Sequence, residues 1–506
     1  MDKNREMLPA DASAQSVSVP YMSQMITSDV GEEFTLPDYY PEVKRVVTTL
    51  CRVLPEAKYD SGDAIEQGGV VAFTVIYLGD DGTLAAAPFS IDYSMSAQHP
   101  KSPVGEDVRI SADSTVEGVT CRATGPRRLM LKAKVRTAVA GIASLPMECK
   151  MTVKDGEATA EEKNSAEKLC CEVQSMSRGW GSVTGSAAGE LHEKAGTKLV
   201  MCDGEICVNE ASPTQNGIIV RGDAVMWCIC YSPDGMYCKL SAKQPFEETV
   251  VTDTPSAEGA RARAWGRSAY VSVKESDDGT LSWEMEYDLE AEWSVCRTSN
   301  AVCDMYSTMH KSSVTMAECD AVSLQKCGAG RLTLSSTGKR HGTPGAGEYV
   351  IGSYGIVRDE RVESAGTRMA LTADAQIHVL VCGGGEVEDE IVHLPVRYEF
   401  DPDRECTGDV SWRIAANVVE CSASVDADSV KATAEVTFAF EVCERTPVKY
   451  VSALALERDE DGSDTGEGVI RICYPDEGEN AWDIAKRYRL KYDDIGEVKS
   501  DGIVIG

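Results

Sequence analysis

Residues 71–93 read VAFTVIYLGDDGTLAAAPFSIDY: an apolar run, a turn that contains Gly82, and a second apolar run that carries Pro88. Two apolar runs joined by a short Asp/Gly turn are typical of a β-hairpin. The pattern returns in residues 224–250 (AVMWCICYSPDGMYCKLSAKQPFEETV) and in residues 375–398 (AQIHVLVCGGGEVEDEIVHLPVRY). A regular internal period indicates one folding unit copied along the chain. We therefore predict three related β units rather than one large domain.

Near the end of each unit, apolar and polar residues alternate strictly, in residues 129–139, 281–293 and 430–442. Side chains alternate across a strand, so this pattern predicts antiparallel sheets with one buried and one solvated face. In residues 281–293 the polar face is acidic, and we interpret it as a solvated sheet face. The alternative is a docking strip for a basic partner. The acidic residues of this face are Glu284, Glu286, Asp288, Glu290 and Glu292.

Composition limits the classes of function. The net charge is −32, which excludes nucleic acid as a partner because phosphate binding needs a basic surface. An anionic membrane surface is disfavoured for the same reason. No segment approaches the roughly 20 apolar residues that span a bilayer, and the first residues, MDKNREM, do not resemble a signal peptide. The 19 cysteines contain no C-x-x-C pair; we expect free thiols in a reducing cytosol.

Candidate chemistry is sparse. His378, His393 and Cys382 belong to the third hairpin, where a metal site is conceivable, but ordinary polar strand positions are the favoured interpretation because three ligands make a poor zinc site. Residues 338–347 (GKRHGTPGAG) are rich in glycine but lack the phosphate-loop pattern, so we predict a hairpin tip. No nucleophile-elbow motif occurs. We therefore expect no enzymatic activity, no catalytic residues, no metal and no cofactor.

Shifts in composition predict the domain boundaries. An N-terminal arm is expected to be disordered, and an acidic Gly/Ser-bearing segment near the C-terminus is expected to be a flexible linker. Residues 154–168 are expected to form a short helix or a linker. The predicted divisions are an arm at 1–25, three β-sandwich-like repeats at 26–150, 151–298 and 299–445, a linker at 446–468, and a small βααβ domain at 469–506.

The last segment carries a recognisable motif. Residues 478–488 read GENAWDIAKRY, with Asn480 suited to cap a helix over residues 481–488. We expect strands at 469–474 and 503–505 and a second short helix at 493–499. Trp482, Ile484, Ala485 and Tyr488 fall in register with the LysM pattern, so the segment resembles a LysM domain.

The LysM resemblance implies a helical core and a contact surface for protein or glycan. Both turns that would hold glycan differ from the family pattern, which favours protein. The implied core and contact residues are Trp482, Ile484, Ala485, Tyr488, Asp476, Gly478, Glu479, Asn480, Asp501 and Gly502.

The repeats also carry family motifs. Residues 36–43 read LPDYYPEV, residues 304–308 read DMYST, and the return runs of the first two hairpins contain Pro-Phe pairs at Pro88 and Pro245. These pieces resemble the SPOCS domain of endospore-forming bacteria, and SPOCS repeats with a terminal LysM resemble the spore coat morphogenetic proteins.

The combined resemblance implies a mother-cell cytoplasmic scaffold at the forespore surface or spore coat, whose LysM part recruits the coat basement-layer morphogenetic ATPase. The alternative is a cell-wall or cortex protein that binds peptidoglycan. A third option is a filler component of the coat with no specific partner.

Overall fold

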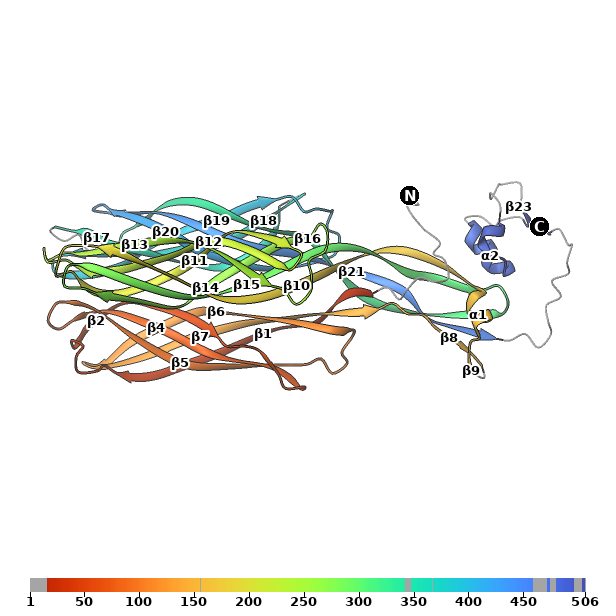
Figure 1. The fold of residues 1–506 in the computed structure, drawn as a ribbon, viewed down its shortest axis with the longest axis horizontal. Coiled ribbons are helices and arrows are strands. Elements are labelled where there is room, and N and C mark those ends of the chain that lie inside the picture. The colour runs from red at the N-terminus through yellow and green to blue at the C-terminus, as the bar shows by residue number, and fades with distance from the viewer. Residues whose placement is uncertain are drawn as a thin grey trace.

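Long antiparallel strands make up most of the protein (Figure 1). The computed structural model describes residues 16–154, 156–341, 347–365, 367–457, 471–473, 479–495 and 503–505. The predicted mainly β class is confirmed, with several antiparallel sheets. No helix among these residues is long and apolar enough to cross a membrane.

The first part of the chain folds into two facing sheets, here called the first sheet pair. One sheet has the order β1–β7–β6, and in the other β4 lies between β2 and β5, with the short β3 also paired to β4. The bounds are β1 (Ser16–Thr35), β2 (Val43–Pro55), β3 (Tyr59–Asp60), β4 (Ala64–Gly79), β5 (Leu84–Gln98), β6 (Glu106–Gly125) and β7 (Arg128–Pro146).

The second sheet pair has the orders β10–β15–β14 and β11–β12–β13, and the third has β16–β21–β20 and β17–β18–β19. In each pair the first of six long strands therefore pairs with the last. The bounds are β10 (Ala166–His192), β11 (Lys198–Thr214), β12 (Gly217–Tyr231), β13 (Tyr237–Val251), β14 (Arg261–Glu275), β15 (Thr280–Ser307), β16 (Lys311–Lys339), β17 (Tyr349–Ala365), β18 (Arg368–Gly383), β19 (Glu386–Phe400), β20 (Asp409–Val425) and β21 (Ser429–Glu457).

The three quoted hairpins are the strand pairs β4–β5, β12–β13 and β18–β19. Gly82 and Gly235 take φ values of +81° and +82° in the first two turns, a conformation that glycine adopts without steric cost. The alternating segments lie on β7, β15 and β21, and their apolar faces are buried between the two sheets of each pair. The prediction of one buried face on these strands is confirmed.

The three sheet pairs pack against one another through an apolar cluster shared by all of them. Ile76 of the first pair, Trp227 of the second and Tyr354 of the third are buried in this cluster. Trp227 and Tyr354 are stacked with ring centroids 5.8 Å apart, and the hydroxyls of Tyr354 and Thr48 are 2.9 Å apart. Sequence reasoning left open whether the repeats pack together, and the shared cluster shows that the sheet pairs do.

A buried ion cluster also joins the sheet pairs. Glu292 of β15 lies 2.9 Å from Arg178, 2.7 Å from Arg263 and 3.2 Å from Arg413, which belongs to the third pair. Arg413 also holds Asp113 of the first pair with two hydrogen bonds of 2.7 and 2.8 Å. Glu292 was expected on a solvated face but is 3% exposed, because this end of β15 packs against the third pair.

Four strands extend beyond the sheet pairs and form a projection that we call the stem: the ends of β10, β15, β16 and β21, with β8 (Lys150–Val153), β9 (Gly156–Glu157) and helix α1 (Ala160–Asn164) (Figure 1). β8 pairs in parallel with β21. Helix α1 falls within the segment predicted as helix or linker and starts with a capping box between Thr159 and Glu162. Met305, Leu454 and Val153 are buried together in the stem.

Several predicted domain boundaries are wrong, because the strands continue beyond them. Residues 16–25 lie in β1 rather than in a disordered arm, because they pair with β7. β15 continues past the predicted division at 298 to Ser307. Residues 446–457, assigned to the flexible linker, continue β21, because they pair with β16 and bury Val451 and Leu456. Residues 1–15 and 458–468 lie outside the described part.

The C-terminal segment follows the predicted element order. β22 (Arg471–Cys473) pairs with β23 (Ile503–Ile505), and helix α2 (Ala481–Tyr488) and the 3₁₀ helix η1 (Tyr492–Asp494) lie between them in sequence. Asn480 caps α2 as predicted, since its side chain accepts a 3.1 Å hydrogen bond from the amide of Asp483. The second helix was predicted at 493–499; η1 is shorter and starts earlier, and residues 496–499 lie outside the described part.

The ion cluster gives a prediction for stability. Replacing Glu292→Ala leaves three guanidinium groups without this carboxylate, and breaking a buried ion pair costs about 3–5 kcal/mol. We expect a lower urea midpoint by circular dichroism. Glu284→Ala, on an exposed position of the same strand, is the matched control and should change the free energy of unfolding by no more than about 0.5 kcal/mol. Equal midpoints for the two variants would contradict the assigned role.

The same cluster predicts a pH dependence. Burial alone would raise the pKa of Glu292, but Arg178, Arg263 and Arg413 hold it below its ordinary value. The stabilisation is then fully present above the unfolded pKa of about 4.3 and is lost as the pH falls through the lower folded pKa. The difference in urea midpoint between the wild type and Glu292→Ala should be constant near neutral pH and shrink in acid. A difference that grows on acidification would contradict this.

Candidate functional site

Two places in the structure combine charged, polar and aromatic groups: the contact between helix α2 and the stem, and a cavity between the three sheet pairs. At the first, Trp482 and Ala485 are buried against Leu169 and Tyr306 of the stem. The rings of Trp482 and Tyr306 meet edge to face with centroids 4.9 Å apart, a favourable geometry for aromatic pairs. Helix α2 is therefore anchored on strands β10 and β15.

Asp304 of β15 is the polar centre of this contact. Its carboxylate accepts a 2.9 Å hydrogen bond from Nε1 of Trp482 and hydrogen bonds of 2.6 and 2.8 Å from Nζ of Lys486. The Tyr306 hydroxyl donates to the carbonyl oxygen of Leu490 at 2.7 Å. Burial alone would raise the pKa of Asp304, but the bonds from Lys486 and Trp482 keep it below its ordinary value.

The predicted site residues separate into four groups. Trp482 and Ala485 are buried against the stem, whereas Ile484 is buried within the segment itself, against Tyr488 and Leu490. Asn480 is exposed and Glu479 forms an ion pair with Arg487. Asp476, Gly478, Asp501 and Gly502 lie outside the described residues. Sequence reasoning missed Asp304 and Tyr306 as partners of the helix, although both belong to the DMYST motif.

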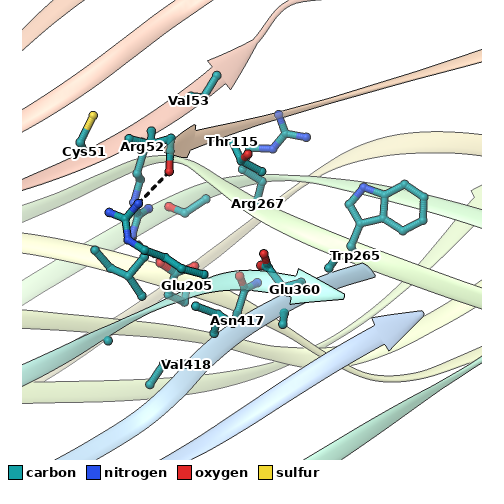
Figure 2. A pocket seen from close by; sticks show the side chains of 18 of the residues that line it. Cys51, Arg52, Val53, Thr115, Glu205, Trp265, Arg267, Glu360, Asn417 and Val418 are labelled. Carbon is teal, nitrogen blue, oxygen red and sulfur yellow. Dashed lines mark hydrogen bonds and ion pairs between the residues drawn. The ribbon is translucent and has the colours of Figure 1, made fainter. Parts of the chain in front are cut away.

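The second place is a cavity of about 650 Å³ lined by strands from all three sheet pairs (Figure 2). β6 supplies Thr115, β14 supplies Trp265 and Arg267, and β17 and β20 supply Glu360 and Asn417. None of these residues was predicted as a site residue. The cavity forms only when the sheet pairs assemble, so no local sequence pattern indicates it.

Charged groups on two walls of the cavity have partners within the protein. Arg52 of β2 lies 2.8 Å from Asp203 and 2.7 Å from Glu205, both on β11. These ion pairs join the first and second sheet pairs. On another wall, the guanidinium of Arg413 lies over the Trp265 ring, 4.3 Å from its centroid. Cations placed in this way are attracted to the face of the indole. The charges of Arg52 and Arg413 are therefore already engaged by neighbours.

The histidines weighed as metal ligands have separate carboxylate partners. Nδ1 of His378 lies 2.7 Å from Asp389, and Nδ1 of His393 lies 2.7 Å from Asp374. Within the described residues, no group of three or more His, Cys, Asp and Glu side chains could hold a metal ion. The Sγ atoms of Cys228 and Cys230 are 3.6 Å apart on the buried face of β12, and the described cysteines are free thiols.

Comparison with known proteins adds no relative: the chain matches no family model, no curated protein and no solved structure. The resemblances to SPOCS and LysM domains therefore stay predictions from the sequence motifs.

The stem contact predicts that Asp304 controls how firmly helix α2 is held. Asp304→Ala removes acceptors from Trp482 and Lys486, and a hydrogen bond to a charged group contributes about 1.5–3 kcal/mol. We expect hydrogen exchange of the amides of residues 481–488 to accelerate roughly tenfold to a hundredfold, measured by mass spectrometry. Asp288→Ala on the same strand, away from the helix, should leave this exchange unchanged. Unchanged exchange in Asp304→Ala would show that the contact does not hold the helix.

Proposed function

We propose that this protein is a non-enzymatic scaffold of endospore coat assembly, built from three SPOCS-like repeats and a LysM-like tail. In this proposal it works in the mother-cell cytoplasm, at the forespore surface or spore coat, and links coat proteins to that surface. The observation that carries the proposal is the position of helix α2, which is anchored on the stem at a distance from the sheet pairs (Figure 1). A recruiting element held away from a rigid body is the arrangement that a scaffold needs.

Two structural features support this arrangement. The paired strands β10–β15 and β16–β21 run without interruption from the sheet pairs into the stem, with single-residue register shifts. The stem is therefore part of the sheets and not a separate linker. The face of α2 away from the stem carries the exposed residues Asp483 and Arg487. A charged helix face of this kind is suited to a polar protein surface.

The partner proposed for this surface is the coat basement-layer morphogenetic ATPase. Peptidoglycan is the competing ligand. Trp482, the aromatic residue of the LysM-like motif, is buried against Tyr306 and bonded to Asp304, so its ring is already occupied by the stem. This occupation favours recruitment of a protein by the outer helix face over stacking of a sugar on Trp482.

A pull-down with the full-length chain tests the proposal, with the purified ATPase and peptidoglycan sacculi as parallel baits. We expect the ATPase to retain the wild type. Trp482→Ala should weaken this retention at least tenfold, because the lost aromatic anchoring is worth more than the about 1.4 kcal/mol that a tenfold change requires. Trp412→Ala, which removes a half-exposed tryptophan from β20, is the matched control and should bind as the wild type does.

The remaining outcomes are also decisive. Retention by sacculi alone would replace the scaffold proposal with the cell-wall alternative. Retention by neither bait would contradict both. Equal retention of Trp482→Ala and the wild type by the ATPase would move the binding surface from the tail to the sheet pairs.

A further inference from the structure

The cavity between the sheet pairs is shaped by irregular strands. β6, β14 and β20 each carry a register shift where they line it, between Val116 and Gly118, between Ser268 and Tyr270, and between Val418 and Glu420. β-bulges of this kind redirect side chains and are common beside binding sites. The corresponding strand of each sheet pair is thus deformed at the same cavity.

A fourth bulge directs a carboxylate to the cavity. β17 shifts register between Arg358 and Arg361, and Asp359 takes a φ of +58°, which is costly for a residue other than glycine. This distortion places the next residue, Glu360, in the cavity wall (Figure 2). Within the described residues, no other side chain pairs with Glu360 or donates a hydrogen bond to it. Burial raises its pKa, and a hydrogen bond from its own backbone amide and the charges of Arg136 and Arg358 oppose that rise.

Other polar groups of the cavity also lack partners. Ser268 is 3% exposed, and its hydroxyl has no hydrogen-bond partner among the described residues. A buried polar group without a partner costs about 1–3 kcal/mol, so the Ser268 hydroxyl is poised for a bond that the described residues do not supply. Asn417 is partly buried in the cavity wall, and its side-chain amide makes no hydrogen bond within the same part of the chain.

Two guanidinium groups near Glu360 have spare donors. Arg358 donates through Nη1 to the carbonyl oxygens of Val116 and Glu117, at 3.0 and 2.9 Å, and pairs with no carboxylate among the described residues. Arg136 has a single long ion pair with Glu117, at 3.5 Å. An arginine has five N–H donors in a planar fork that matches a carboxylate. The cavity therefore offers donors for an anionic group and, in Glu360, a carboxylate without a side-chain partner among the described residues for a cationic one.

We propose that this cavity binds a small zwitterion, an amino acid or short peptide, whose carboxylate lies at Arg136 and Arg358 and whose ammonium group lies at Glu360. A simple anion would leave the Glu360 carboxylate uncompensated, and a simple amine would leave the guanidinium donors unused. Asn417 and Ser268 supply the additional hydrogen bonds. The volume of about 650 Å³ falls within the range of roughly 300–1,000 Å³ that is usual for small-molecule sites.

Binding would be coupled to assembly of the sheet pairs. Arg136 belongs to the first pair, Ser268 to the second, and Glu360 and Asn417 to the third. A ligand that contacts all three binds only the assembled form and stabilises it by mass action. This inference rests on the cavity alone and does not depend on the proposed scaffold function.

Calorimetric titration and thermal unfolding of the full-length chain test the proposal. The probes are the common protein amino acids and alanyl-alanine, with propionate and ethylamine as probes that carry one charge only. We expect saturable heat and a raised unfolding temperature for at least one zwitterion. Propionate and ethylamine should bind at least tenfold more weakly than that zwitterion. Glu360→Gln and Arg136→Gln should each weaken binding of the zwitterion at least tenfold.

Glu363→Gln is the matched control, because Glu363 lies on the same strand in a surface ion pair with Arg361 and should bind as the wild type does. Far-ultraviolet circular dichroism of each variant separates lost binding from lost folding. The proposal is overturned if no zwitterion binds, if propionate or ethylamine binds as tightly as the best zwitterion, or if folded Glu360→Gln binds as the wild type does.

Discussion

One carboxylate, that of Glu292, connects the parts of this protein. It lies among Arg178 and Arg263 of its own sheet pair and Arg413 of the third, and Arg413 continues the connection to Asp113 of the first. Buried charges are tolerated only when they are paired, and here the pairing is complete only when all three sheet pairs are assembled. In a sheet pair by itself, some charges of the cluster would be exposed to solvent or would lack their partners. The cluster therefore fixes how the sheet pairs meet, and the cavity and the stem both depend on that arrangement.

Glu292 also shows where sequence reasoning stops. The two-residue alternation of residues 281–293 correctly predicts which side chains of β15 enter the core, from Leu281 to Trp293. On the other face the same pattern treats Glu284 and Glu292 alike, yet Glu284 is exposed and Glu292 is buried. A periodic pattern identifies a face but carries no information on what a polar face packs against. One of the partners of Glu292, Arg413, is far away in the sequence and meets this carboxylate only through the tertiary fold.

The same limit applies to the two candidate sites. The cap at Asn480 and the helix at Ala481–Tyr488 were predictable because their signals are local. The docking of Trp482 on Asp304 was not, because an apolar stripe on a helix gives no indication of which surface covers it. A segment of about 40 residues buries little apolar surface by itself, which explains why it uses the stem to bury Trp482. The cavity had no sequence signal, since its bulges arise from pairing registers that only the assembled sheets define.

The cavity and the ion cluster share a wall. Arg263 and Arg413 of the cluster also line the cavity, and their guanidinium groups lie over the ring of Trp265 in the same wall. The cations of the cluster are balanced by Glu292, Glu441 and Asp113. By contrast, Glu360, on a strand distorted at Asp359, has no side-chain partner in the described part of the chain. A fold that neutralises its most buried charges so completely, yet keeps a strained backbone that directs this carboxylate into a polar cavity, retains that feature at a cost in stability. Strain of this kind persists where it is part of a function, and a ligand that supplies the missing cation is the simplest physical reason for it.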